Sequence, residues 1–94
     1  MGHSGLQKEV LALYRRALRM INSKPAPNRP NFYILVQHEF RVRGAVSPRD
    51  VNTIEYLMRQ GRKRLEVLED RGVKECWVSG EMRAWWDSTG RRRA

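Results

Sequence analysis

Apolar side chains recur at intervals of three and four residues near the start of the chain, and this spacing predicts a helix. Ser4 and Gln7 have capping-box spacing at its beginning. The apolar arc covers about half of the circumference, so we expect contact with two other helices, or with one helix and a ligand or partner. The apolar positions are Leu6, Val10, Leu11, Leu13, Tyr14, Ala17, Leu18, Met20 and Ile21.

A second helix is predicted after a loop at residues 23–30, where three prolines fix backbone angles and remove hydrogen-bond donors. We expect Asn31 to be its N-cap and Gly44 to mark its end. This segment is apolar on two sides, which is typical of a helix held between neighbours. One side carries Phe32, Tyr33, Val36 and Phe40, and the other carries Ile34, Leu35 and Val42.

A third helix is predicted between Ser47, as N-cap before Pro48, and Gly72, as a C-terminal stop. Its apolar face contains Val51, Ile54, Met58, Gly61, Leu65 and Leu68. Three helices joined by short loops predict an all-α fold, an antiparallel three-helix bundle over residues 1–72.

The composition changes in residues 73–94, which form a predicted C-terminal tail rich in tryptophan and arginine. This segment holds Trp77, Trp85, Trp86, Arg91, Arg92 and Arg93. A short helix over Glu81 to Trp86, capped by Ser79, is expected. The tail either folds back over a groove of the bundle or docks on another protein, since Trp and Arg often anchor interfaces.

The chain carries a formal net charge of +9 over 94 residues, which favours an anionic counterpart such as nucleic acid, an anionic lipid surface or an acidic protein. Uninterrupted apolar runs such as Phe32 to Val36 are too short to span a bilayer. Cys76 is the single cysteine, and His3 and His38 lie far apart without a metal-binding spacing. We therefore expect no catalysis, no cofactor and no metal held by this chain.

The triplet Leu13-Tyr14-Arg15 lies in the middle of the first helix. Leu13 falls on the core face, Tyr14 can pack its ring while its hydroxyl finds a partner, and Arg15 falls outside the apolar arc. The triplet either serves packing and solubility alone or shapes a site for a partner.

Basic side chains gather on the first and third predicted helices. They are Arg15, Arg16, Arg19, Arg59, Arg62, Lys63 and Arg64. Clustered arginines suit an acidic protein surface. Alternatively, they solvate exposed faces, and Glu55 with Arg59 and Arg62 with Glu66 pair along the helix at i,i+4 spacing.

Gly61 lies in the centre of the third helix's apolar face, where glycine costs about 1 kcal/mol relative to alanine. Either two helices cross closely at this point, or the position leaves room for an acyl chain or a partner side chain.

The chain resembles the LYR-motif family of small, basic, mitochondrial helical proteins over most of residues 4–70. The resemblance rests on SGLQKEVLALYR at the front, on Glu39-Phe40 and on IEYLMRQGRKRL from Ile54 to Leu65. Some relatives carry a second Leu-Tyr-Arg at the position of Leu57 to Arg59, where this chain has Met58 in place of tyrosine. The tail from Val73 onward lies outside the resemblance.

This resemblance implies a non-catalytic adaptor of the mitochondrial matrix. The most similar members are thought to bind the iron–sulfur subunit of succinate dehydrogenase, to receive clusters from an iron–sulfur transfer co-chaperone and to shield them. Several members also hold acyl carrier protein, whose acyl chain enters the helical bundle. The implied partner-binding residues are Leu13, Tyr14, Arg15, Arg19, Phe40, Arg59, Gly61, Arg62, Lys63 and Arg64.

Two other functions stay open from the sequence. One is an adaptor of the same family for a different respiratory complex, for the cysteine desulfurase or for acyl carrier protein. The other is a basic nucleic-acid-binding module. Two observations argue against it: the basic residues are spread over two helices, and the sequence lacks the glycine turn of a helix-turn-helix motif. An arginine-rich first helix with Glu9 as its one acid resembles a matrix-targeting segment.

Overall fold

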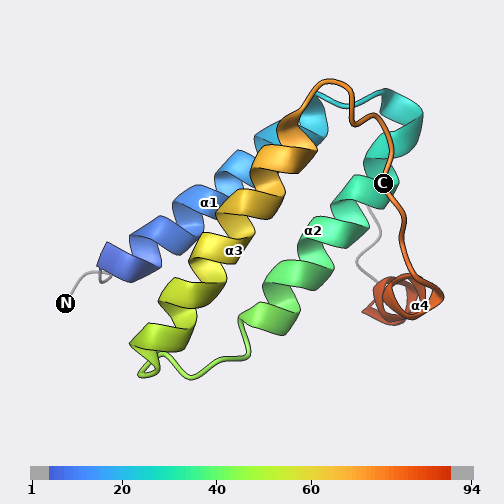
Figure 1. Ribbon diagram of the computed structural model, residues 1–94. Coiled ribbons are helices and arrows are strands. Elements are labelled where there is room, and N and C mark those ends of the chain that lie inside the picture. Colours follow the sequence, from blue (N-terminus) through green and yellow to red (C-terminus); the bar gives the residue numbers. More distant parts are fainter. Residues whose placement is uncertain (1–4, 90–94) are drawn as a thin grey trace.

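The computed structural model describes residues 5–89, and every regular element in that range is helical (Figure 1). The elements are α1 (Gly5–Asn22), the short 3₁₀ helix η1 (Ala26–Asn28), α2 (Arg29–Arg43), α3 (Val51–Glu69) and α4 (Gly80–Thr89). The predicted all-α class is confirmed in these residues. The expected cap at Ser4 lies outside the described range.

Helix α2 begins three residues earlier than predicted. Asn28 is its cap residue, and Pro30 lies within the first turn instead of in the preceding loop. The choice of Asn31 as N-cap was wrong because proline is tolerated in the first turn, where its missing N–H has no helical acceptor. The predicted end is confirmed, since Gly44 donates its N–H to the Phe40 carbonyl at 2.8 Å.

Helix α3 is capped by Asp50, whose carboxylate accepts a hydrogen bond from the N–H of Thr53 at 3.2 Å. The prediction of Ser47 as N-cap was wrong, because Ser47 belongs to a turn in which its carbonyl accepts the Asp50 N–H at 3.0 Å. The helix also ends at Glu69, before the predicted stop at Gly72.

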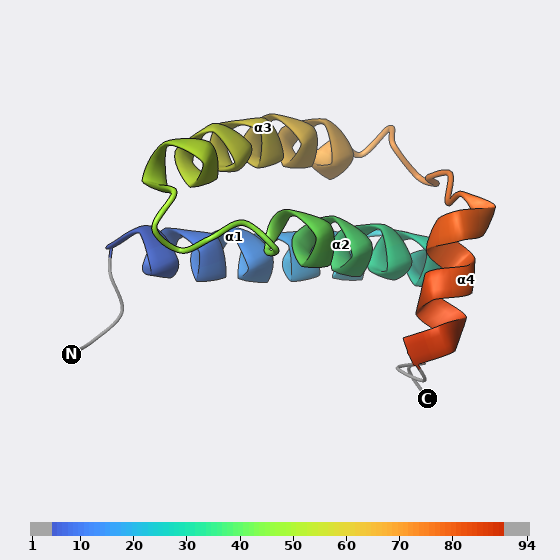
Figure 2. The same ribbon diagram turned by 90° about the horizontal axis from the view of Figure 1, so that it is seen from below.

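Helix α1 contacts both α2 and α3, whereas the backbones of α2 and α3 lie further apart. Figure 2 shows α1 and α2 side by side with α3 above them, and successive long helices run in opposite directions (Figure 1). The core consists of Leu13, Ala17, Met20, Ile21, Phe32, Val36, Met58 and Leu65. The arrangement is therefore an open one, with α1 as the shared neighbour, which agrees with its broad apolar arc.

A buried lysine joins the α1–α2 turn to the segment after α3. Lys24 is only 4% exposed, and its ammonium donates hydrogen bonds to the carbonyls of Asp70 at 3.1 Å and Val73 at 2.5 Å. The same ammonium lies 5.3 Å from the centre of the Phe32 ring, within cation–π distance. These contacts satisfy the buried charge and fix where the chain leaves α3.

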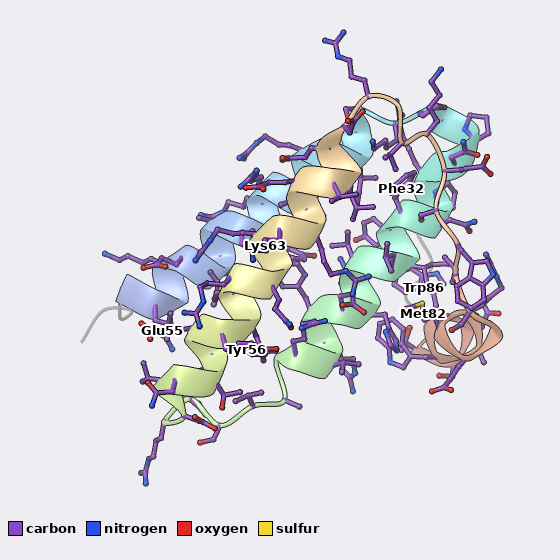
Figure 3. All side chains as sticks on the ribbon, viewed as in Figure 1. Phe32, Glu55, Tyr56, Lys63, Met82 and Trp86 are labelled. Atoms are coloured by element: carbon purple, nitrogen blue, oxygen red, sulfur yellow. The ribbon has the colours of Figure 1, made fainter. Side chains whose placement is uncertain are left out.

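Helix α4 folds back onto α2. Ser79 caps it as predicted by accepting the Met82 N–H at 3.0 Å. Trp86 is 7% exposed and its ring packs edge-on against Tyr33, with 5.5 Å between the ring centres. Figure 3 labels Met82 and Trp86 on this helix. Of the two interpretations of the tail, this geometry favours the one in which it folds back over the bundle. Trp77, which precedes α4, is nevertheless 79% exposed.

A bidentate ion pair ties α1 to the end of α3. The guanidinium of Arg16 donates to both carboxylate oxygens of Glu69, at 2.8 and 2.7 Å. The hydrogen bonds raise the pKa of Arg16 and lower the pKa of Glu69 below its usual value. Since Glu69 binds protons less readily in the folded chain, the pair stabilises the fold at neutral pH and loses this effect as the pH falls through the lowered pKa.

We expect Glu69→Gln to reduce the free energy of unfolding at pH 7 by about 0.5–1 kcal/mol, because the two side chains are about one-third exposed and partly screened. The difference from the wild type should shrink as the pH falls and vanish at an acid pH below the lowered pKa of Glu69. Urea unfolding followed by circular dichroism at both pH values measures this. Glu75→Gln, at an exposed position, is the control; an undiminished Glu69→Gln deficit at low pH would contradict the assignment.

Candidate functional site

An apolar cavity of about 470 Å³ lies between α1, α2 and α3. It exists because α2 and α3 both pack on α1 without closing against each other. Its volume is within the range of about 300–1,000 Å³ found for ligand sites. Aliphatic side chains dominate the lining, which is formed by Leu6, Gln7, Val10, Leu11, Leu13, Ala17, Leu35, Val36, Glu39, Phe40, Arg43, Gly44, Val46, Pro48, Ile54, Leu57, Met58, Gly61, Arg64, Leu65 and Leu68.

The Leu13-Tyr14-Arg15 triplet runs from the core to the solvent. Leu13 is 8% exposed and lines the cavity, whereas Arg15 is exposed. The hydroxyl of Tyr14 accepts a hydrogen bond from the Gln37 amide at 2.5 Å, and its ring packs edge-on against Phe40 with 5.0 Å between centres. Tyr14 therefore joins α1 to α2 beside the cavity, and Phe40 forms part of the cavity wall.

Gly61 faces Leu13 at the point where α3 crosses α1. A Cβ atom at this position would lie 3.2 Å from Leu13 Cδ2, closer than ordinary van der Waals contact. Gly61 also lines the cavity. The sequence left open either a close helix crossing or room for a guest at Gly61. The close crossing lies in the cavity wall, so both explanations apply to the same place.

The outward face of α3 combines cations with exposed apolar groups. Arg59 and Lys63 are exposed, and Tyr56 and Val67 are 51% and 64% exposed. Tyr56 and Lys63 are two turns apart on α3 and are labelled in Figure 3. The sequence therefore brings one basic and apolar stripe to the surface of this helix. Arg19 adds an exposed cation at the end of α1.

Arg62 has an ion-pair partner on α1 instead of along its own helix. Its guanidinium lies 4.0 Å from the carboxylate of Glu9. The i,i+4 pairs that the sequence allowed as an alternative, Arg62 with Glu66 and Glu55 with Arg59, are not among the ion pairs of residues 5–89.

A polar bridge joins α2 to α3 along the edge of the cavity. Glu39 accepts hydrogen bonds from Arg43 at 3.0 Å and from Arg64 at 3.2 Å, and Arg43 also donates to the Gln60 amide oxygen at 3.4 Å. The Glu39–Arg43 pair has i,i+4 spacing and was visible in the sequence. Its role across the cavity was not, since it requires the position of α3.

The remaining chemistry-bearing residues support packing. His38 is partly buried, and its ring lies edge-on to Trp85 with 5.3 Å between centres. Burial raises the pKa of the Cys76 thiol. Within residues 5–89, no group of three or more His, Cys, Asp or Glu side chains is arranged to hold a metal ion. In the same range, no helix combines the length and apolarity needed to cross a membrane.

Comparison with known proteins identifies related sequences. The sequence profile of the family described as "Complex 1 protein (LYR family)" matches residues 8–67. Succinate dehydrogenase assembly factor 1, mitochondrial, of Saccharomyces cerevisiae (strain S288c) is 44% identical over 65 residues, covering 69% of this chain and 82% of the relative. No solved structure matches significantly.

Two further relatives carry similar names. Succinate dehydrogenase assembly factor 1A, mitochondrial, of Dictyostelium discoideum is 42% identical over 71 residues, covering 72% of this chain and 77% of the relative. Succinate dehydrogenase assembly factor 1, mitochondrial, of Schizosaccharomyces pombe is 36% identical over 79 residues, covering 84% of this chain and all of the relative.

Proposed function

This chain belongs to the complex 1 LYR protein family, and from that membership we propose that it is a non-catalytic assembly factor for succinate dehydrogenase, respiratory complex II. The observation that carries the proposal is the similarity to named succinate dehydrogenase assembly factors over most of both chains. Because those relatives are named mitochondrial, the place of action proposed for this chain is the mitochondrion, and specifically the matrix.

The client in this proposal is the iron–sulfur subunit, which the protein binds during maturation while a co-chaperone delivers the clusters. The basic and apolar stripe of α3 supports this, because Arg59 and Lys63 offer cations to an acidic surface while Tyr56 and Val67 offer contact area. The chain would hold and protect the client, and the clusters would be bound by the client's own ligands.

We expect Arg59→Ala to weaken binding of the purified iron–sulfur subunit about 5- to 30-fold, the cost of a hydrogen-bonded charge contact at an interface. The same change at Arg49, an exposed arginine before α3, is the matched control and should alter affinity less than twofold. Biolayer interferometry with the immobilised subunit measures both. Equal losses for the two variants would indicate a net-charge effect and contradict a specific role for Arg59.

The salt dependence of binding distinguishes the proposed function from the nucleic-acid alternative. Binding to RNA or DNA driven by phosphate contacts falls steeply as salt rises. In the proposed function, the client is retained at physiological salt and nucleic acid is not. Recovery of mainly RNA and ribosomal proteins from a mitochondrial pull-down would overturn the adaptor assignment.

Acyl carrier protein is a second proposed partner, and the apolar cavity is the observation that favours it. A cavity of about 470 Å³ lined mostly by aliphatic side chains suits an acyl chain. Intact mass spectrometry of acyl carrier protein captured from mitochondria on the wild-type protein tests this. Capture of the acylated form would support the proposal, and absence of any carrier would refute it.

A further inference from the structure

The polar bridge between α2 and α3 lies over a cavity whose other walls are apolar. Glu39, Arg43 and Arg64 all line the cavity. Glu39 contributes one carboxylate to two guanidinium groups, so the three residues together carry a formal charge of +1. Within residues 5–89, this bridge supplies hydrogen bonds and an ion pair between the side chains of α2 and α3.

We propose that Glu39 is an electrostatic latch that holds the α2–α3 edge of the cavity closed, and that the carboxylate of an entering fatty acid replaces it on Arg43 and Arg64. This inference rests on the second proposed function only in that both place a hydrocarbon chain in the same cavity, and it concerns how that cavity is opened. In the empty protein the two arginines then bind Glu39, and in the occupied protein they bind the anionic group of the ligand.

The geometry supports an exchangeable contact. The Glu39 side chain is 26% exposed, and those of Arg43 and Arg64 are 30% and 53% exposed, so each group reaches solvent while facing the cavity. Such partly exposed pairs are weak and exchange partners easily. The wider separation of the α2 and α3 backbones means that little packing has to be broken when the latch opens.

Charge favours an anionic group on the chain. When Glu39 releases its partners, two guanidinium groups remain beside an apolar space, and guanidinium pairs well with carboxylate and phosphate. An uncharged chain would separate Glu39 from the two arginines without giving them a new anionic partner. The cavity should therefore bind acids more tightly than their neutral analogues.

The test uses the full-length chain and two fluorescent probes, cis-parinaric acid and its methyl ester, titrated at pH 7.5. Glu39→Gln frees both arginines and should bind the acid about two- to fivefold more tightly than the wild type, the size of a partly exposed ion pair. The double variant Arg43→Gln/Arg64→Gln also opens the latch but removes the cations. It should therefore gain affinity for the ester and show no gain for the acid.

Glu81→Gln on α4 removes a carboxylate of the same type far from the cavity and is the control. Circular dichroism confirms that each variant is folded before titration. Equal affinities of the wild type and Glu39→Gln for the acid, or an equal gain in Glu81→Gln, would overturn the latch. Since no acyl carrier protein is used, failure of the partner proposal leaves this result readable. Absence of probe binding in every variant would refute the cavity as a chain-binding site.

Discussion

Gly61→Arg is expected to leave the chain unable to fold stably and without affinity for the iron–sulfur subunit. Even a methyl group at this position would meet Leu13 at 3.2 Å, and a guanidinium side chain is far larger. Overpacking a core typically costs about 1–3 kcal/mol, and placing a charge against an apolar wall adds to this. In a chain of this size, about 3 kcal/mol corresponds to a fall in Tm of more than 10 °C.

Gly61→Ala is the matched control. Its added methyl group meets the flexible end of Leu13, which can move by a few tenths of an ångström, and alanine favours helix by about 1 kcal/mol over glycine. We expect a Tm close to that of the wild type. Thermal unfolding by circular dichroism and binding by interferometry measure both variants. A Gly61→Arg protein that folded normally and bound at full strength would contradict both the close crossing and the cavity-wall role.

Phe32→Ala is expected to have the second-largest effect, a loss of about 3–5 kcal/mol in the free energy of unfolding, which is the usual cost of truncating a buried phenylalanine. Phe32 is 0% exposed and is the largest fully buried side chain of the described range. Its ring also faces the Lys24 ammonium. Because small domains have only about 5–15 kcal/mol in total, this loss is a large fraction of the free energy of unfolding and should lower the Tm.

Urea unfolding at 10 °C followed by circular dichroism measures this loss. Val42→Ala on the same helix removes apolar atoms from a residue that is 57% exposed and should stay within about 0.5 kcal/mol of the wild type. If the two variants unfolded at the same urea concentration, Phe32 would not be a core residue.

The helices were predictable because their signals are local. Apolar spacing located α1, α2 and α3, and Ser79 identified the start of α4. The predicted helix boundaries were wrong where two nearby residues can both serve as the cap. Ser47 and Asp50 are both good caps, and the turn that Ser47 forms leaves the cap of α3 to Asp50.

The cavity and its bridge were not predictable because they depend on distances between helices. The pattern identified Gly61 as unusual and Tyr14 as a packing residue with a hydroxyl to satisfy, and the structure supplies Leu13 and Gln37 as their partners. In the sequence, Lys24 looks like an ordinary loop lysine. Its structural role was not predictable because its two carbonyl acceptors lie 46 and 49 residues away along the chain. The partner-binding roles of the exposed arginines remain predictions.

The position of α1 between the other two long helices implies an order of assembly. Helices α1 and α2 are joined by a short turn, so their hairpin closes a small loop and forms early. Docking of α3 requires contacts such as that of Arg16 with Glu69, 53 residues apart, and follows at a higher entropic cost. Until then the α3-facing side of α1 is uncovered. We therefore expect the α1–α2 hairpin to form before α3 docks, so that the cavity between the three helices is completed last.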